Sequence, residues 1–123
     1  MLKETISLPL IMGVRCRVSR VRTMTYRTWL CGYVRLWPGH PWEREADLSS
    51  VDVIDVHGGV TYAKFEADGC FWVGFDCAHW GDGAFEEPNG VVKTEDFVMA
   101  ELARLVEQAI DADPSGVSRG LHL

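Results

Sequence analysis

The chain has 123 residues, of which 47% are hydrophobic and 24% are charged, and its formal net charge is −6 at pH 7. These values are typical of one globular domain with a real core, and no apolar run approaches the roughly 20 residues of a membrane-spanning helix. Duplex nucleic acid is a poor partner for so acidic a chain, because neutralisation of phosphates dominates that affinity. Residues 6–14 are mildly apolar, but Pro9 interrupts them and no small-residue cleavage site follows, so no signal peptide is predicted.

Charge is distributed unevenly along the chain. The first 44 residues carry eight basic and two acidic side chains, whereas the rest carry four basic and sixteen acidic ones. Two interpretations stay open. Either the two halves attract each other on folding or within an oligomer, or the arginines form an anion-binding face. Four widely spaced cysteines without a CxxC pair predict reduced thiols and a cytoplasmic protein; they are Cys16, Cys31, Cys70 and Cys77.

The first half of the chain predicts a loosely held arm at residues 1–13, followed by a globular core at residues 14–112. Residues 14–21 alternate between apolar and polar side chains, and residues 29–36 are rich in aromatic and branched ones, so both are predicted strands. Met24 is a possible alternative start, which would make the first strand dispensable. Two prolines at 38 and 41 predict a rigid turn. Its His40 and Trp42 either rim a ligand pocket or cover the core.

Three more strands are predicted around two turns in the middle of the chain. Gly58 and Gly59 supply the positive φ of a tight hairpin between strands at 51–57 and 60–65, and a turn at 67–69 precedes a strand at 70–77. If both turns are tight, His57 comes close to Asp76 and His79.

A C-terminal helix is predicted at residues 97–112, with Thr94 as its N-cap. Its apolar stripe consists of Val98, Leu102, Leu105, Val106 and Ala109, and its solvated face of Glu101, Arg104, Glu107 and Gln108. A mobile tail is expected at residues 115–123. The whole chain, residues 1–123, therefore predicts a single α+β domain: an antiparallel sheet of four to five strands with the C-terminal helix packed on one face. Exposed sheet edges predict a homo-oligomer.

The segment at 74–82, GFDCAHWGD, concentrates two carboxylates, a thiol, an imidazole and an indole. Aromatic faces stack on nucleobases, at about 1–3 kcal/mol each, and aspartates hydrogen-bond ribose hydroxyls. No glycine-rich phosphate loop is present, so a phosphate would meet arginine, histidine or backbone N–H groups. The candidate ligand-binding residues are His40, Trp42, Asp55, His57, Tyr62, Asp76, His79, Trp80 and Asp82.

Other interpretations of the same segment stay open. His57 and His79 could act as an acid–base pair and open a phosphodiester or glycosidic bond, with an imidazole oriented by Asp55, Asp76 or Asp82. Asp76 and Asp82 could instead only cap turns. Zinc could be held by Cys31, His57, Cys77 and His79, but structural zinc sites use two close ligand pairs and only Cys77 and His79 are close. Neither a metal nor another cofactor is predicted.

An ordered set of motifs resembles small uncharacterised proteins of bacteriophages and prophages, many of them from actinobacterial hosts. The motifs are CGYV at 31–34, GHP at 39–41, DVHGGVTY at 55–62, WVGFDCAH at 72–79 and GD at 81–82. The helix from Phe97 to Gln108 is similar as well. The resemblance covers about two-thirds of the chain; residues 1–28 lie outside it, and Trp37 departs from the pattern.

The resemblance implies phage origin and action in the cytoplasm of the host cell. The function expected from it and from the candidate site is that of a phage accessory protein, which binds and sequesters a small nucleotide-derived signal of host defence. One alternative is a phosphodiesterase-type enzyme that cleaves such a molecule. Another is a protein inhibitor that covers a host factor with its acidic surface.

Overall fold

The computed structural model covers the whole chain and describes residues 1–25, 27–45, 48, 54–79, 82 and 92–116. Within these residues, regular structure consists of β-strands, one α-helix and two short 3-10 turns. The strands are β1 (Leu2–Ser7), β2 (Leu10–Ile11), β3 (Val14–Arg22), β4 (Thr28–Arg35), β5 (Tyr62–Phe65) and β6 (Phe71–Asp76). The helix is α1 (Glu95–Ala112), and the turns are η1 (Pro41–Arg44) and η3 (Pro114–Gly116).

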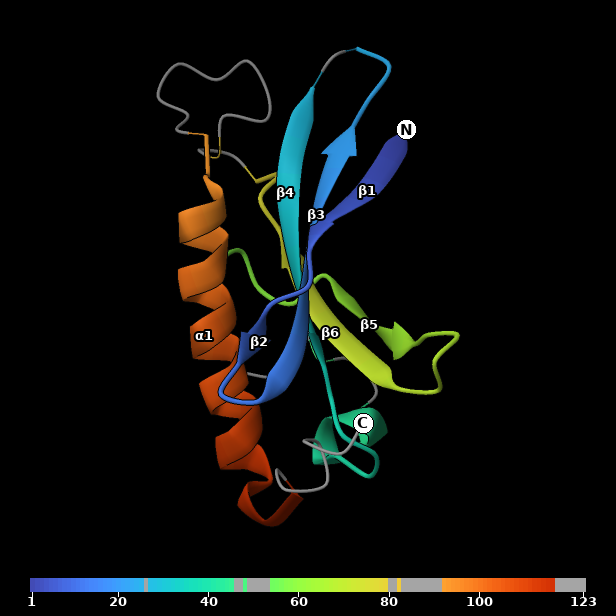
Figure 1. Cartoon of the computed structure of the whole chain (residues 1–123), viewed down its shortest axis with the longest axis vertical. Helices are drawn as coiled ribbons and strands as arrows, with labels where there is room; N and C mark the ends of the chain where they lie inside the picture. The colour runs from blue at the N-terminus through green and yellow to red at the C-terminus, as the bar shows by residue number, and fades with distance from the viewer. Residues whose placement is uncertain (26, 46–47, 49–53, 80–81, 83–91, 117–123) are drawn as a thin grey trace.

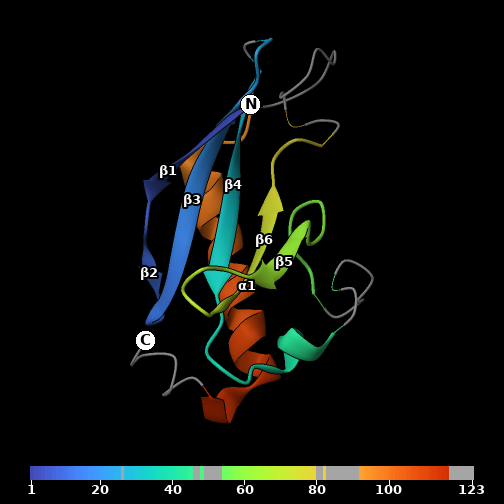
Figure 2. The ribbon, with the colours of Figure 1, turned by 90° about the vertical axis from the view of Figure 1, so that its right-hand side faces the viewer.

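The strands form one antiparallel sheet with the order β1-β3-β4-β6-β5, and β2 pairs beside it with β3. Helix α1 lies along one face of the sheet (Figure 1), and β1 and β5 form its two edges (Figure 2). The predicted α+β fold, an antiparallel sheet with a C-terminal helix on one face, is therefore confirmed. No helix in the described part of the chain is long and apolar enough to cross a membrane.

The main core lies between the sheet and α1. Alternate residues of the strands point toward the helix, and they meet the predicted apolar stripe of α1, all of whose members are buried. Gly32 on β4 shows how tight this contact is, since a Cβ atom there would lie 2.8 Å from the Phe75 ring and 3.1 Å from Leu102. The sheet residues of this core include Val14, Cys16, Val18, Leu30, Val34, Val73 and Phe75.

The opposite face of the sheet carries a smaller apolar cluster, which no helix of the described residues covers. Its buried members are Val21, Cys31, Tyr33, Cys70 and Trp72, with Trp29 and Tyr62 packed against them. These residues alternate along the strands with those of the main core, as the two-residue repeat of a strand requires. The sheet therefore carries a large apolar core on the face toward α1 and a smaller apolar cluster on the other face.

The helix begins as its capping residue predicts. Thr94 Oγ1 accepts a hydrogen bond from the backbone N–H of Phe97 at 3.3 Å, and Glu95 and Asp96 lie in the first turn, where the helix dipole favours negative charge. At the other end the η3 turn begins at Pro114. The remainder of the predicted tail, residues 117–123, lies outside the described residues.

The prediction that Glu101 is solvated is wrong. Its side chain is buried, and its Oε1 accepts a hydrogen bond from the backbone N–H of His57 at 2.8 Å, while Arg104 donates to both carboxylate oxygens. The helical repeat places Glu101 beside the apolar stripe, and its carboxylate accepts a backbone hydrogen bond from the loop before β5. The periodicity of the helix sequence does not show that the N–H of His57 needs this acceptor.

Replacement of Glu101 by alanine is expected to destabilise the protein by about 1–3 kcal/mol, because the N–H of His57 loses its buried partner. The measurement is urea unfolding followed by circular dichroism. Glu107→Ala is the matched control, since Glu107 is an exposed glutamate of the same helix. Equal and small effects of the two substitutions would contradict the assignment.

The predicted loose arm at residues 1–13 is also wrong. Residues 2–7 pair with β3 as β1, and β2 joins β3 through a two-residue turn in which Met12 and Gly13 have φ values of 50° and 78°. Two positive φ values are those of a type I′ hairpin turn. Most of β1 is exposed, so backbone pairing rather than burial holds it, and the hydrophobic pattern gives little sign of it.

The strand predicted at 51–57 is not found in its described part, since residues 54–57 form no strand; residues 51–53 lie outside the description. The strand predicted at 60–65 is limited to β5. Ile54, Val56 and Val60 are buried nonetheless. Side chains of α1 take the place of a neighbouring strand: Gln108 accepts from the N–H of Asp55 and donates to its carbonyl, and Glu101 accepts from the N–H of His57.

Candidate functional site

Three of the predicted site residues meet at the end of β6. The His57 Nε2 atom lies 2.8 and 2.9 Å from the two carboxylate oxygens of Asp82, and the rings of His57 and His79 are 5.7 Å apart. A carboxylate only accepts hydrogen bonds, so Nε2 of His57 carries the proton. The predicted proximity of His57 to His79 is confirmed. We call His57, Asp76, His79 and Asp82 the histidine cluster.

Local backbone contacts build this cluster. Asp82 Oδ2 accepts from the N–H of His79 at 3.0 Å, and the N–H of Asp82 donates to the carbonyl of His79 at 3.0 Å. Asp76 Oδ1 accepts from the N–H of Ala78 at 3.1 Å. Both aspartates therefore cap the turn after β6, as one interpretation predicted, but Asp82 also binds the imidazole of His57.

The turn at Gly58 fixes the other side of the cluster. The N–H of Gly59 donates to the carbonyl of Val56 at 2.9 Å, and Gly58 and Gly59 have φ values of 68° and 83°. A Cβ atom on Gly58 would lie 2.1 Å from Nε2 of His79, whereas one on Gly59 would meet nothing within 4 Å. Glycine at 58 is therefore required twice, by its φ and by the imidazole beside it.

The imidazole of His79 is held less completely. Its Nε2 lies 3.0 Å from Asp76 Oδ1, but the alignment makes no hydrogen bond, and among the described residues this is a buried polar atom without such a partner. Buried polar atoms are nearly always paired. Nε2 of His79 is therefore a polar atom whose hydrogen-bonding capacity the described residues do not use.

Asp76 also lines a pocket on the uncovered face of the sheet, which we call the aromatic pocket. Its volume is about 340 Å³, and its walls include Lys3, Trp29, Cys31, Tyr33, Tyr62 and Asp76. Asp76 and Cys31 are register partners on β6 and β4. The pocket therefore opens next to the histidine cluster and shares Asp76 with it.

A hydrogen-bond network fixes the aromatic rings of this pocket. Arg17 donates to both oxygens of Glu66 at 2.9 and 2.7 Å, and the Tyr62 hydroxyl donates to Glu66 at 2.7 Å. Burial, together with the Glu66 carboxylate, raises the pKa of Tyr62 to about 12, so the phenol stays protonated. The ring of Tyr62 stands edge-on to that of Tyr33, with centroids 5.0 Å apart.

Lys3 supplies the cation of the pocket. Its Nζ lies 4.4 Å from the ring centroid of Tyr33 and 5.4 Å from that of Tyr62. Partial burial lowers the pKa of Lys3, but the residue as a whole is exposed on β1, so solvent and an anion can reach it.

The structure places the remaining predicted residues elsewhere. Asp55 is exposed and paired with Arg104 on the helix side. His40 and Trp42 are buried, and Nε2 of His40 donates to the carbonyl of Ala109, near the C-terminal end of α1. Neither residue lines the aromatic pocket, and their burial supports the alternative interpretation that they cover the core. Trp80 lies outside the described residues.

The buried His40 makes stability depend on pH. Burial lowers its pKa below the usual 6.5, because the charged ring would lose its hydration, and the hydrogen bond that Nε2 donates to the carbonyl of Ala109 only partly opposes this shift. The unfolded chain therefore binds a proton more readily. The stability that neutral His40 supports is complete above pH 6.5 and decreases as the pH falls below it.

We expect the free energy of unfolding to fall by up to about 1.4 kcal/mol per pH unit below that point on account of His40. Denaturant unfolding of the parent and of His40→Gln between pH 7.5 and pH ~5 measures this. The variant is less stable at neutral pH but should lose less stability on acidification. Parallel pH profiles for the two proteins would contradict the assignment.

The four residues that were considered as zinc ligands, but not predicted to bind it, do not come together as a metal site: within the described residues no group of three histidine, cysteine or acidic side chains could hold an ion. Cys77 points into the main core, and burial raises its pKa to about 12, which disfavours the thiolate that zinc requires. All four cysteines are buried and unbridged.

Sequence reasoning missed several residues of the aromatic pocket, among them Lys3, Trp29 and Tyr33. The signal was available, because Trp29, Cys31 and Tyr33 alternate along a predicted strand and so share one face. Lys3 could not be found in this way, since it belongs to the segment predicted as an arm.

Comparison with models of protein families, with curated proteins and with solved structures gave no match.

Proposed function

We propose that this protein binds a small nucleotide-type ligand in the aromatic pocket and holds it unchanged. The observation that carries the proposal is that one pocket combines aromatic rings, a lysine and a carboxylate. Its volume of about 340 Å³ is near the lower end of the roughly 300–1,000 Å³ of small-molecule sites. This size favours a ligand with one nucleobase over a dinucleotide.

Each part of such a ligand has a suitable partner. The half-buried rings of Trp29 and Tyr62 offer faces or edges to a base, and base stacking on aromatic side chains contributes roughly 1–3 kcal/mol per base. Lys3 would attract a phosphate. Asp76 would accept hydrogen bonds from ribose hydroxyls, as acidic residues do in dinucleotide sites.

The biological part of the proposal rests on the resemblance to small phage and prophage proteins. Such a protein would act in the cytoplasm of the infected cell, and binding without turnover would sequester a nucleotide-derived signal of host defence. Edge strands β1 and β5 offer unpaired backbone groups for a second copy. A homo-oligomer is therefore part of the proposal, and light scattering after gel filtration tests it.

Titration calorimetry with a panel of nucleotides, followed by chromatography of the released ligand, tests the function. We expect one nucleotide class to bind and to be released unchanged. Tyr62→Leu should weaken binding by about 1–3 kcal/mol, because a stacking face is lost. Phe65→Leu should leave it unchanged, since Phe65 is an exposed aromatic residue of the same strand and does not line the pocket.

A second candidate function is cleavage of such a ligand, and the histidine cluster favours it. Asp82 accepts the hydrogen bond from Nε2–H of His57, so Nδ1 of that ring is the nitrogen with the free lone pair. Nε2 of His79 makes no hydrogen bond to the described part of the chain. These are the features of an oriented base beside a second proton-transfer group. Altered ligand on release would support this candidate over sequestration.

Three variants separate the two candidates: His57→Ala, His79→Ala and Asp76→Ala. If the protein only binds, each loses affinity in steps of about 1–3 kcal/mol per hydrogen bond. If it cleaves, turnover falls by about 100-fold or more while affinity changes less. A folded parent that binds no nucleotide of the panel would refute both and favour an inhibitor of a host protein.

A further inference from the structure

A second pocket lies on the opposite face of β3 and β4 from the aromatic pocket, near the tip of their hairpin. Along β3, the side chains that face α1 are apolar at Val14, Cys16 and Val18, and the same alternation continues with Arg20 and Arg22. On β4 the register partners of these arginines are Leu30 and Thr28. The core face of the sheet therefore becomes basic at this end.

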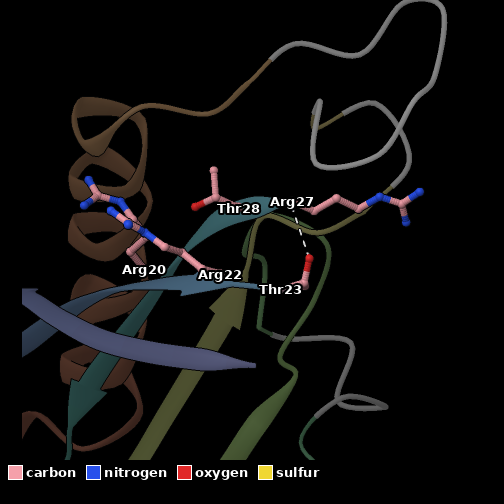
Figure 3. Close-up of a pocket in the computed structure, with 5 residues that line it drawn as sticks. All are labelled: Arg20, Arg22, Thr23, Arg27 and Thr28. Carbon is pink, nitrogen blue, oxygen red and sulfur yellow. Dashed lines mark hydrogen bonds between the residues drawn. The ribbon is translucent and has the colours of Figure 1, made fainter. Parts of the chain in front are cut away.

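The pocket has a volume of about 460 Å³ and is lined by Arg20, Arg22, Thr23, Arg27 and Thr28; we call it the arginine pocket. In Figure 3 the side chains of Arg20 and Arg22 extend in the same direction, and Thr28 projects beside them from the neighbouring strand. The backbone N–H of Arg27 donates to Thr23 Oγ1 at 3.1 Å, which closes the hairpin tip. Two guanidinium groups and a hydroxyl thus face one hollow.

The charges of Arg20 and Arg22 are incompletely compensated by Glu4 of β1. Both guanidinium groups lie 3.6 Å from the same oxygen, Glu4 Oε1, which is beyond ordinary hydrogen-bond length, and their side chains are 33% and 57% exposed. Exposed pairs of this kind contribute only about 0–1 kcal/mol. Among the contacts described, one carboxylate therefore faces two like charges, and an added anion would relieve their repulsion.

We propose that the arginine pocket binds a small anion with two or more phosphate groups. Guanidinium groups bind phosphate through two parallel hydrogen bonds, and the threonine hydroxyl can donate to a further oxygen. A volume of about 460 Å³ suits a small molecule. The net charge of −6 disfavours a long polyanion, whose other phosphates would meet acidic surface.

Glu4 gives the proposal a directional test. A bound phosphate must share the two guanidinium groups with this carboxylate, so removing the carboxylate charge should strengthen binding. If the two arginines serve only to hold β1 against β3, the protein has no affinity for the anion, and Glu4→Gln cannot increase it.

The experiment is titration calorimetry of the full chain with pyrophosphate, and with orthophosphate for comparison. Pyrophosphate should bind at one site per chain and more tightly than orthophosphate. Arg20→Gln and Arg22→Gln should each weaken it by about tenfold or more, since hydrogen bonds to charged groups contribute roughly 1.5–3 kcal/mol. Glu4→Gln should tighten it several-fold.

Arg15→Gln is the matched control, because it removes the same charge from the same strand but far from the pocket, where Arg15 donates to the carbonyl of Leu8. It should leave pyrophosphate affinity within about twofold of the parent if contact rather than net charge decides binding. Circular dichroism confirms that each variant is folded. Absence of pyrophosphate binding by the folded parent, or equal losses for Arg15→Gln and Arg20→Gln, would overturn the proposal.

Discussion

A chain that begins at Met24 is expected to lose its cooperative fold. The deletion removes β1, β2 and β3, and β3 is an inner strand that pairs with β4 from Cys16 to Arg22. It also removes Val14, Cys16 and Val18 from the main core. At about 1.5–3 kcal/mol for each large apolar side chain, this loss is comparable with the whole stability of a small domain, about 5–15 kcal/mol.

Thermal unfolding followed by near- and far-ultraviolet circular dichroism measures this effect. A shorter deletion of residues 1–8 is the control, because it removes an edge strand that is mostly exposed. That variant should still melt cooperatively, at a lower temperature. A cooperative transition of the Met24 chain near the parent melting temperature would show that β3 is dispensable and would refute the core described above.

Replacement of Gly58 by alanine is expected to displace His79 and, if the proposed function is right, to weaken ligand binding about as much as His79→Ala does. Both Gly58 and Gly59 have positive φ, so alanine at either position costs roughly 1–2 kcal/mol of backbone strain. Only the Cβ atom at 58 also collides with the imidazole of His79, at 2.1 Å, so the imidazole has to move. The ring of His57, which Phe97 and Asp82 contact, lies 5.7 Å from it.

Gly59→Ala is therefore a matched control that carries the same backbone strain without the collision. In denaturant unfolding both variants should lose the stability that the backbone strain costs, and Gly58→Ala should lose more because of the collision. Only Gly58→Ala should shift the imidazole resonances of His79 in NMR spectra and lose affinity. Identical behaviour of the two variants would mean that His79 does not lie against Gly58.

The proximity of His57 and His79 in the histidine cluster could be predicted from the sequence, although the hairpin on which the prediction rested is not formed as expected. Two glycines and a strand pattern suggested a hairpin that would bring His57 to His79, and the two residues do meet. The segment before Gly58 is not a strand, however, and Glu101 and Gln108 of α1 hold its backbone. Such side chain to backbone bonds connect residues more than 40 positions apart and leave no periodic signal.

The sequence also did not predict which polar residues are buried. His40 and Glu101 look like surface residues by type and by position, yet His40 is fully buried and Glu101 nearly so. Both are tolerated because each finds partners: the carbonyl of Ala109 and the N–H of Trp42 for His40, the N–H of His57 and Arg104 for Glu101. Those partners exist only in the folded chain.

The sequence by itself determined the α+β class, the two strands β3 and β4, the helix with its Thr94 cap and its apolar stripe, and the stretch that carries the histidine cluster. These features follow from local repeats and capping chemistry, which act between residues close in the chain. The tertiary structure alone decided that residues 2–7 are a strand, that His40 and Trp42 belong to the core, and that Lys3 and Arg17 meet Tyr33. These outcomes depend on which surfaces remain for backbone and side chains to pair once the core has formed, and that is a property of the whole chain.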